Sequence, residues 1–165
     1  MARAIASLLL AAVLSCISCA ERSDEDLRMP SEILSQVFDS VMAYVWKGEV
    51  SGQDDFNACR GRFAKMLIDS MRTDDLDSRE SFARAQVLHW SGRSGEAEKL
   101  LQPLAAGDDR TARRASAQLV TIRIEDERFK EAEHLIREYR RRFPPDPEVD
   151  SGMHMCVDDM AMRYN

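Results

Sequence analysis

The sequence predicts an all-α fold, and three observations indicate this class. Glycine and proline, which most often interrupt helices, number only seven and five among the 165 residues. From Ser31 onward, apolar residues recur three and four positions apart, as one face of a helix requires. The segment Gly92–Leu101 (GRSGEAEKLL) is also echoed 35 residues later by Glu127–Ile136 (ERFKEAEHLI). Helices that alternate with tight turns at such a period are typical of stacked helical hairpins.

The first two helices are expected between Ser31 and Arg72. Pro30, followed by Ser31 and Glu32, is a favourable helix start, and Gly48 is a stop signal. The polar stretch GEVSGQDD separates the two helices. The apolar positions are Ile33, Leu34, Val37, Phe38, Val41, Met42, Val45 and Trp46 in the first helix, and Phe56, Cys59, Phe63, Met66, Leu67 and Met71 in the second.

Four further helices are expected before Phe143. Ser91 and Gly92 end the third helix, Pro103 should kink or end the fourth, and the two prolines after Phe143 end the sixth. The positions expected to be buried are Phe82, Ala85 and Leu88; Ala97, Leu100, Leu101 and Leu104; Ala115, Leu119 and Ile122; and Phe129, Ala132, Leu135, Ile136 and Tyr139. A short last helix is expected within Met153–Tyr164. No segment alternates at period two, so no sheet is predicted.

The first twenty residues have the composition of an export signal. Arg3 precedes the apolar run from Ala4 to Leu14, which is too short to span a bilayer but suits a signal peptide. Cleavage after Ala20 is one interpretation. In the other, the stretch VLSC resembles a bacterial lipobox, with Cys16 as the lipidated residue and Cys19 as a poorer alternative. We therefore expect a signal in residues 1–20, a polar tether in 21–30 and a helical domain in 31–165.

The two echoed segments resemble the tetratricopeptide repeat family. Gly92 and Ala97 match the turn glycine and the following alanine of that family, and Ala132 and Pro144 match the alanine and terminal proline of the next unit. The match is incomplete, because Glu127 stands where the second glycine would be. The resemblance implies a degenerate array of about three antiparallel hairpins with a C-terminal capping helix. An unrelated helical bundle is the alternative.

Composition and motifs argue against several function classes. A net charge of −6 disfavours nucleic-acid binding, which needs a basic surface. The sequence contains no nucleophile motif, phosphate-binding loop, dinucleotide fingerprint or zinc spacing. Its histidines, among them His89 and His134, are scattered. We therefore expect neither catalytic activity nor a cofactor.

Three arginines at the start of the fifth helix are the candidate partner-binding site. Arg110, Arg113 and Arg114 lie near a helix N-terminus, where cations do not favour the helix dipole. In the family that the chain resembles, the first helix of each hairpin lines a concave groove. The resemblance therefore implies that these arginines meet an acidic peptide or a terminal carboxylate. The alternative is a solvated face paired with nearby carboxylates.

The last residues are rich in soft side chains. Two interpretations follow: a methionine-rich helix that caps the array, which we favour, or a Cu(I) site formed by Met153, His154, Met155, Cys156 and Met160. Cys59 is either a partner for Cys156 in a disulfide or a small buried hydrophobe, as we favour.

These observations together predict an exported, membrane-anchored protein-interaction scaffold or assembly module. It would lie in the periplasm or cell envelope, held to a membrane through a lipid anchor, with other proteins or peptides as partners and no nucleic acid. The alternative is a periplasmic copper or redox accessory protein that uses its C-terminal segment.

Overall fold

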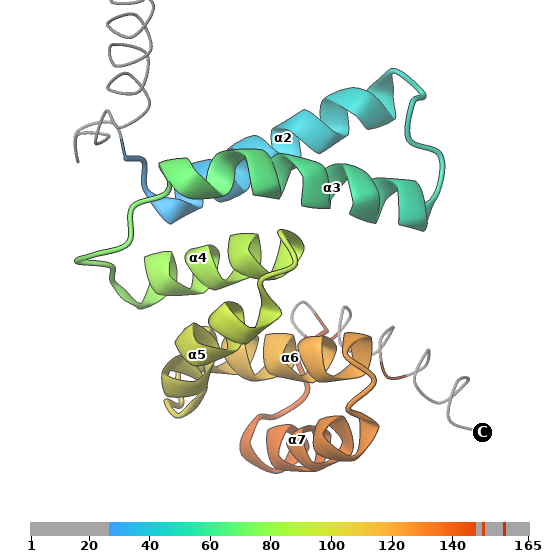
Figure 1. The fold of residues 1–165 in the computed structure, drawn as a ribbon. Coiled ribbons are helices and arrows are strands. Elements are labelled where there is room, and N and C mark those ends of the chain that lie inside the picture. Colours follow the sequence, from blue (N-terminus) through green and yellow to red (C-terminus); the bar gives the residue numbers. More distant parts are fainter. Residues whose placement is uncertain (1–26, 148–149, 151–156, 158–165) are drawn as a thin grey trace, which may run out of the picture.

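The computed structural model describes residues 27–147 together with Asp150 and Val157. This part of the chain forms α-helices and one 3-10 turn, with no strand, so the all-α prediction is confirmed (Figure 1). The elements are α2 (Pro30–Trp46), α3 (Gln53–Leu67), η2 (Ile68–Ser70), α4 (Ser78–Trp90), α5 (Ser94–Ala105), α6 (Arg110–Glu125) and α7 (Phe129–Arg142).

The helix boundaries follow the expected signals closely. Pro103 lies inside α5, and the helix ends two residues later at Ala105. Asp77 and Asp109 are the N-caps of α4 and α6, and each carboxylate accepts a hydrogen bond from a backbone N–H of the first turn. The predicted signal in residues 1–20 lies outside the described residues, and so does the predicted helix in Met153–Tyr164 apart from Val157.

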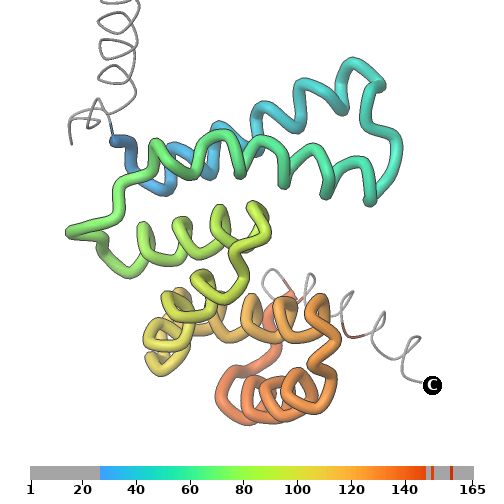
Figure 2. Tube along the Cα trace, in the orientation of Figure 1, coloured from blue at the N-terminus to red at the C-terminus, as the bar shows by residue number. Residues whose placement is uncertain are grey.

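Each helix packs against its neighbour in the chain, and α4 lies at the centre. It contacts α2, α3, α5 and α6, and Figure 2 follows the chain from α2 at one end to α7 at the other. The packing of alternate helices is not uniform, since α4 packs more extensively on α2 than on α3, whereas α6 packs far more extensively on α5 than on α4. One apolar cluster runs from α2 to α6, and a second lies between α6 and α7.

The echoed segments form the same local structure. After α4, Gly92 has φ +86°, and the Arg93 N–H donates to the Leu88 oxygen at 2.9 Å. After α6, Glu127 has φ +58°, and the Arg128 N–H donates to the Arg123 oxygen at 2.8 Å. The next helix then begins in both places.

The side chains of the two echoed segments match as well. Arg93 pairs with Glu96, and Arg128 pairs with Glu131, three residues on in each case. Ala97 and Ala132 are both fully buried. The sequence echo therefore corresponds to a repeated structure, which consists of one turn, the Arg–Glu ion pair after it and the buried alanine of the helix that follows.

Glu127 is expected to strain its turn, and Glu127→Gly should relieve that strain. An L-residue in the left-handed region costs roughly 1–2 kcal/mol, and part of this gain is offset by the larger unfolded-state entropy of glycine. We expect a net stabilisation of about 0.5–1 kcal/mol, measured as a higher urea midpoint. Gly92→Ala, at the matching position with φ +86°, should shift the midpoint the opposite way. A destabilised Glu127→Gly variant would contradict this account.

The chain joins the fold earlier than the predicted tether allows. The Arg28 N–H donates to the Ser70 oxygen at 2.9 Å, and the Arg72 N–H donates to the Arg28 oxygen at 2.8 Å, which forms an isolated parallel bridge. Pro30 is buried. The prediction that the tether extends to residue 30 is therefore wrong, because the backbone of Arg28 pairs with the end of η2.

Candidate functional site

The predicted arginine site is not assembled, because Arg113 is buried within the fold. It is 8% exposed. Its Nε donates to the Tyr139 hydroxyl at 2.9 Å, and its Nη2 donates to both Asp150 oxygens at 3.1 and 3.2 Å. The Tyr139 hydroxyl donates to Asp150 in turn. The prediction that Arg113 lines an open groove is therefore wrong, because α7 and the segment after it supply internal partners. Arg110 and Arg114 are exposed on α6.

The acidic partner of this buried ion pair is held in its charged form. Burial alone would raise the pKa of the Asp150 carboxyl, but hydrogen bonds from the Asp146 N–H, the Tyr139 hydroxyl and Arg113 outweigh it and lower that pKa. Asp146 also lies 3.9 Å from Arg113 Nη1. This cluster joins α6 to the chain beyond α7 and is structural.

Tyr139 should make the fold sensitive to alkali. Burial, followed by the hydrogen bond to Asp150, raises the pKa of Tyr139 to about 12. Because the folded state favours the neutral phenol, this contribution to stability is complete below the unfolded pKa of about 10. It is lost as the pH rises from about 10 toward about 12. We expect the urea midpoint to fall across this window. Tyr139→Phe should flatten that slope, and an unchanged slope would contradict the assignment.

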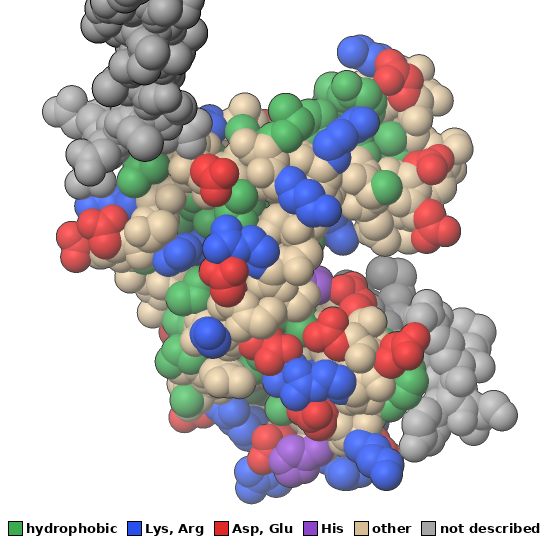
Figure 3. Space-filling model, viewed as in Figure 1, with side chains coloured by type: hydrophobic (Ala, Val, Ile, Leu, Met, Phe, Trp, Pro, Cys, Tyr) green, Lys and Arg blue, Asp and Glu red, His purple; other side chains and the backbone are tan. Residues whose placement is uncertain are grey.

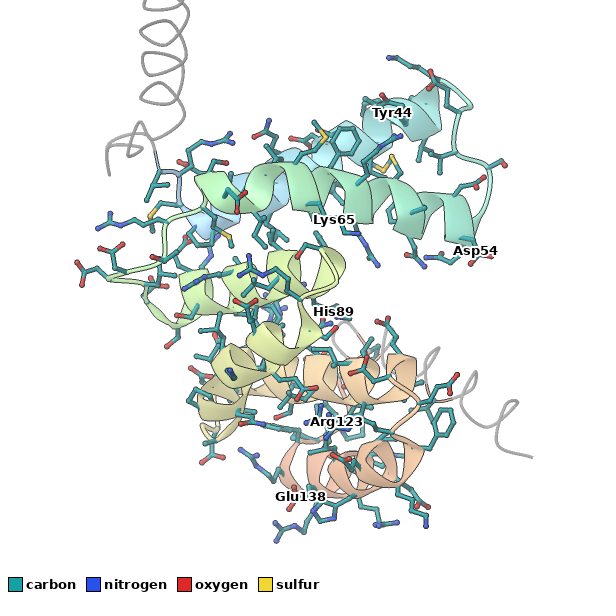
Figure 4. All side chains as sticks on the ribbon, in the orientation of Figure 1. Tyr44, Asp54, Lys65, His89, Arg123 and Glu138 are labelled. Atoms are coloured by element: carbon teal, nitrogen blue, oxygen red, sulfur yellow. The ribbon has the colours of Figure 1, made fainter. Side chains whose placement is uncertain are left out.

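A second polar set lies where α3, α4 and α6 meet. It consists of Arg60, His89, Trp90 and Glu125. Figure 3 shows the surface hollowed between α3 and α6, and His89, labelled in Figure 4, lies at the inner side of this hollow. We call this set the junction site.

The Arg60 guanidinium is stacked on aromatic rings. Its guanidinium carbon lies 4.7 Å from the Trp90 ring centroid and 5.9 Å from that of Phe56. Its Nη2 donates to Asn57 Oδ1 at 3.0 Å, while its buried Nε has no hydrogen-bond partner within the described part of the chain. Burial lowers the pKa of Arg60, and the negative charge of Glu125 opposes that shift. Among the described residues, no carboxylate lies within 4.0 Å of this guanidinium.

His89 links three helices at the base of the junction site. Its Nε2 lies 3.0 Å from Glu125 Oε2, and its Nδ1 lies 3.4 Å from the Ser94 hydroxyl. The hydrogen bond from His89 lowers the pKa of the Glu125 carboxyl, although partial burial opposes that effect. The side chain of His89 is 7% exposed and that of Glu125 is 51% exposed, so the buried imidazole positions a carboxylate that remains accessible to solvent.

Gly61 allows α3 to approach the end of α4 closely. A Cβ at this position would lie 3.1 Å from the backbone oxygen of Trp90, which is tighter than ordinary van der Waals contact. This approach places Arg60 over the Trp90 ring. The sequence analysis did not predict the junction site; a glycine inside a predicted helix is a signal for such an approach, and Gly61 could have indicated it.

Three large apolar side chains of the first helix pair remain exposed. Trp46 is 79%, Met66 70% and Phe38 52% exposed. Phe38 and Trp46 follow the apolar spacing of the first helix without being buried, and the prediction that Met66 belongs to the apolar stripe of the second helix is wrong in that its side chain is exposed. The core takes one narrow stripe of α2, which consists of Pro30, Ile33, Val37 and Val41.

The remaining sequence candidates are placed as follows. Cys59 is buried with a free thiol, as the small-hydrophobe interpretation expects. The soft-ligand set Met153, His154, Met155, Cys156 and Met160 lies outside the described residues, as do Cys16 and Cys19. Within the described part of the chain, no group of three or more His, Cys, Asp or Glu side chains is arranged to hold a metal ion.

None of the helices that the structure describes has the length and apolar character needed to cross a membrane. Comparison with protein families, curated proteins and solved structures finds no match.

Proposed function

We propose that this chain is a protein-interaction module, which acts as a scaffold or assembly factor and binds its partner at the junction site. The observation that carries the proposal is the Arg60 guanidinium, which is stacked on Trp90 and has no carboxylate partner among the described residues. The Nη groups of a stacked guanidinium can still donate to a carboxylate, and such a planar group loses little entropy on binding. The partner would supply that carboxylate, and Arg60 would take the binding role that the sequence analysis predicted for Arg113.

The repeated turns support the wider architecture of this proposal. The turns at Gly92 and Glu127 share their backbone conformation and the ion pair that follows. We therefore infer an array of about three hairpins of the tetratricopeptide type. Stacked hairpins of this kind present long surfaces to partners.

Export and a lipid on Cys16, or alternatively on Cys19, complete the proposed function. Arg28 follows Cys16 by twelve positions, so an extended chain would let the fold lie up to about 40 Å from the anchor. Mass spectrometry of the membrane-extracted chain tests this part. An unmodified chain that begins at Glu21 would contradict lipidation.

Crosslinking in the cell tests the junction site. A photoreactive residue at Gln86 of α4, near His89 and Trp90 in the chain, should give a discrete protein adduct. The same residue at Glu133, on the exposed face of α7, should give none. Arg60→Lys should reduce the Gln86 adduct, because lysine keeps the charge but loses the planar fork. Arg62→Lys is the matched control. Equal adducts in both variants would contradict the role of Arg60.

A further inference from the structure

We infer that the junction site recognises a dipolar segment of a partner protein, in which a carboxylate binds Arg60 and a neighbouring basic side chain binds Glu125. By dipolar we mean that the segment carries one acidic and one basic side chain close together. The inference rests on the proposed function, which requires only the carboxylate, and adds the second charge that decides which acidic partners fit.

Contacts across three helices place the two charges of the junction site at the same hollow. The Arg60 guanidinium of α3 lies over the Trp90 ring of α4. His89, the residue before Trp90, has its Nε2 3.0 Å from Glu125 Oε2 of α6. Against the burial that lowers the pKa of Arg60, the negative charge of Glu125 acts to raise it. No nitrogen of Arg60, however, lies within 4.0 Å of a Glu125 oxygen. The two charges therefore face each other without forming an ion pair.

Partial burial distinguishes Arg60 from the arginines on the helix surfaces. Among the described arginines, Arg60 and Arg123 have a pKa that is lowered, with burial as the first cause. Arg123 is compensated by ion pairs with Glu98 and Glu131. Arg60 has no such compensation within the described part of the chain. A charge that is already partly removed from water gains more from a carboxylate than a solvated charge does.

The edge of Arg60 that is left for a partner is narrow. Its Nη2 donates to Asn57 Oδ1, and Gln53 donates to the same oxygen at 3.1 Å, so Asn57 is held in place. The buried Nε has no hydrogen-bond partner among the described residues, and neither has Nη1. Arg60 is therefore suited to one carboxylate at Nη1 and not to a cluster of them.

Glu125 keeps its charge at a place where the fold disfavours one. It is the last residue of α6, where the helix dipole repels an anion. The hydrogen bond from His89 nevertheless lowers the pKa of the Glu125 carboxyl, and the charge of Arg60 adds a smaller effect in the same direction. His89 engages Oε2, and no other described residue donates to this carboxylate. The other oxygen, Oε1, is thus left for a cation.

This arrangement selects between partners by their charge pattern. A purely acidic segment would bring a like charge against Glu125, and a purely basic segment would bring one against Arg60, so both are disfavoured. A dipolar segment satisfies both groups and leaves no charge unpaired when the hollow is closed. Side chains three or four positions apart on a helix have Cβ atoms about 5–6 Å from each other. Such a spacing lets one helical turn of a partner supply both charges.

Selection from a random peptide library displayed on phage tests the inference on the full chain. We expect the selected peptides to share an acidic and a basic residue at a fixed spacing, and Arg60→Lys to weaken their binding. Peptides that share an acidic residue without a basic one would overturn the inference and leave the proposed function standing. Failure to select any peptide whose binding depends on Arg60 would overturn both.

Glu125→Gln measures the contribution of the second charge, because glutamine keeps the size of the side chain and an oxygen that accepts from His89. Fluorescence polarisation should show that a selected peptide binds this variant about fivefold more weakly, as expected for a partly exposed charge pair. A peptide with glutamate in place of its basic residue should bind the variant more tightly than the original chain, which a loss of structure would not produce.

Asp126→Asn is the matched control for this variant. Asp126 is the next residue after Glu125 and is exposed, so its replacement removes the same charge from the same end of α6. It should leave the binding of both peptides unchanged. Equal effects of Glu125→Gln and Asp126→Asn would overturn the assignment of the basic side chain to Glu125.

Discussion

Arg113→Ala is expected to destabilise the fold by about 3–5 kcal/mol, as the loss of one partner of a buried ion pair does. The substitution leaves the Asp150 carboxylate buried, with its strongest counter-charge removed and the Tyr139 hydroxyl facing a gap. Urea unfolding followed by circular dichroism measures the loss. If the variant does not fold at all, thermal unfolding of Arg113→Lys supplies a milder version of the same test.

The adjacent residue is the control for this prediction. Arg114 is exposed on α6, so Arg114→Ala should change stability by no more than about 0.5 kcal/mol. Replacing both partners, as Arg113→Met with Asp150→Leu, should recover most of the loss because no buried charge remains. Similar losses for Arg113→Ala and Arg114→Ala would show that Arg113 is not buried in an ion pair.

Leu101→Ala should cost about 2–5 kcal/mol, the range for removing a large side chain from a packed core. Leu101 is fully buried in the apolar cluster that extends from α2 to α6. Its loss therefore weakens the contacts of α5 with both neighbouring helices. The urea midpoint should fall with little change in the slope of the transition.

The neighbouring position separates this core effect from a general sensitivity of α5. Gln102 is exposed on the same helix, and Gln102→Ala should be nearly neutral. A loss below about 1 kcal/mol for Leu101→Ala would indicate that the two faces of α5 are assigned in the wrong phase.

Local sequence patterns predicted the helices because helix formation depends on signals within a few residues. The spacing of Ile33, Val37 and Val41 marks the buried stripe of α2 correctly. Ala97 and Ala132, recognised through the echo, are both fully buried. The same spacing overstated the width of the stripe at Trp46, because periodicity shows which residues share a face and not where the neighbouring helices end.

The candidate site was harder to predict because it depends on contacts between distant segments. Asp150 follows Arg113 by 37 residues, and only the return of the chain after α7 brings them together. Arg60 and Glu125 belong to helices that have no shared pattern in the sequence. Gly61 indicates that another segment approaches α3 closely, but the sequence does not show that this neighbour is Trp90.

The bridge between Arg28 and Met71 has a mechanical consequence. A force applied to the chain before Arg28 acts first on two backbone hydrogen bonds, one between Arg28 and Ser70 and one between Arg72 and Arg28. Only after these bonds break does it act on the first turn of α2. Tension is therefore shared between α2 and the η2–α4 connection, and α2 is not peeled away one turn at a time. Under the anchoring proposed above, this arrangement would let the folded body bear load while its helices keep their positions.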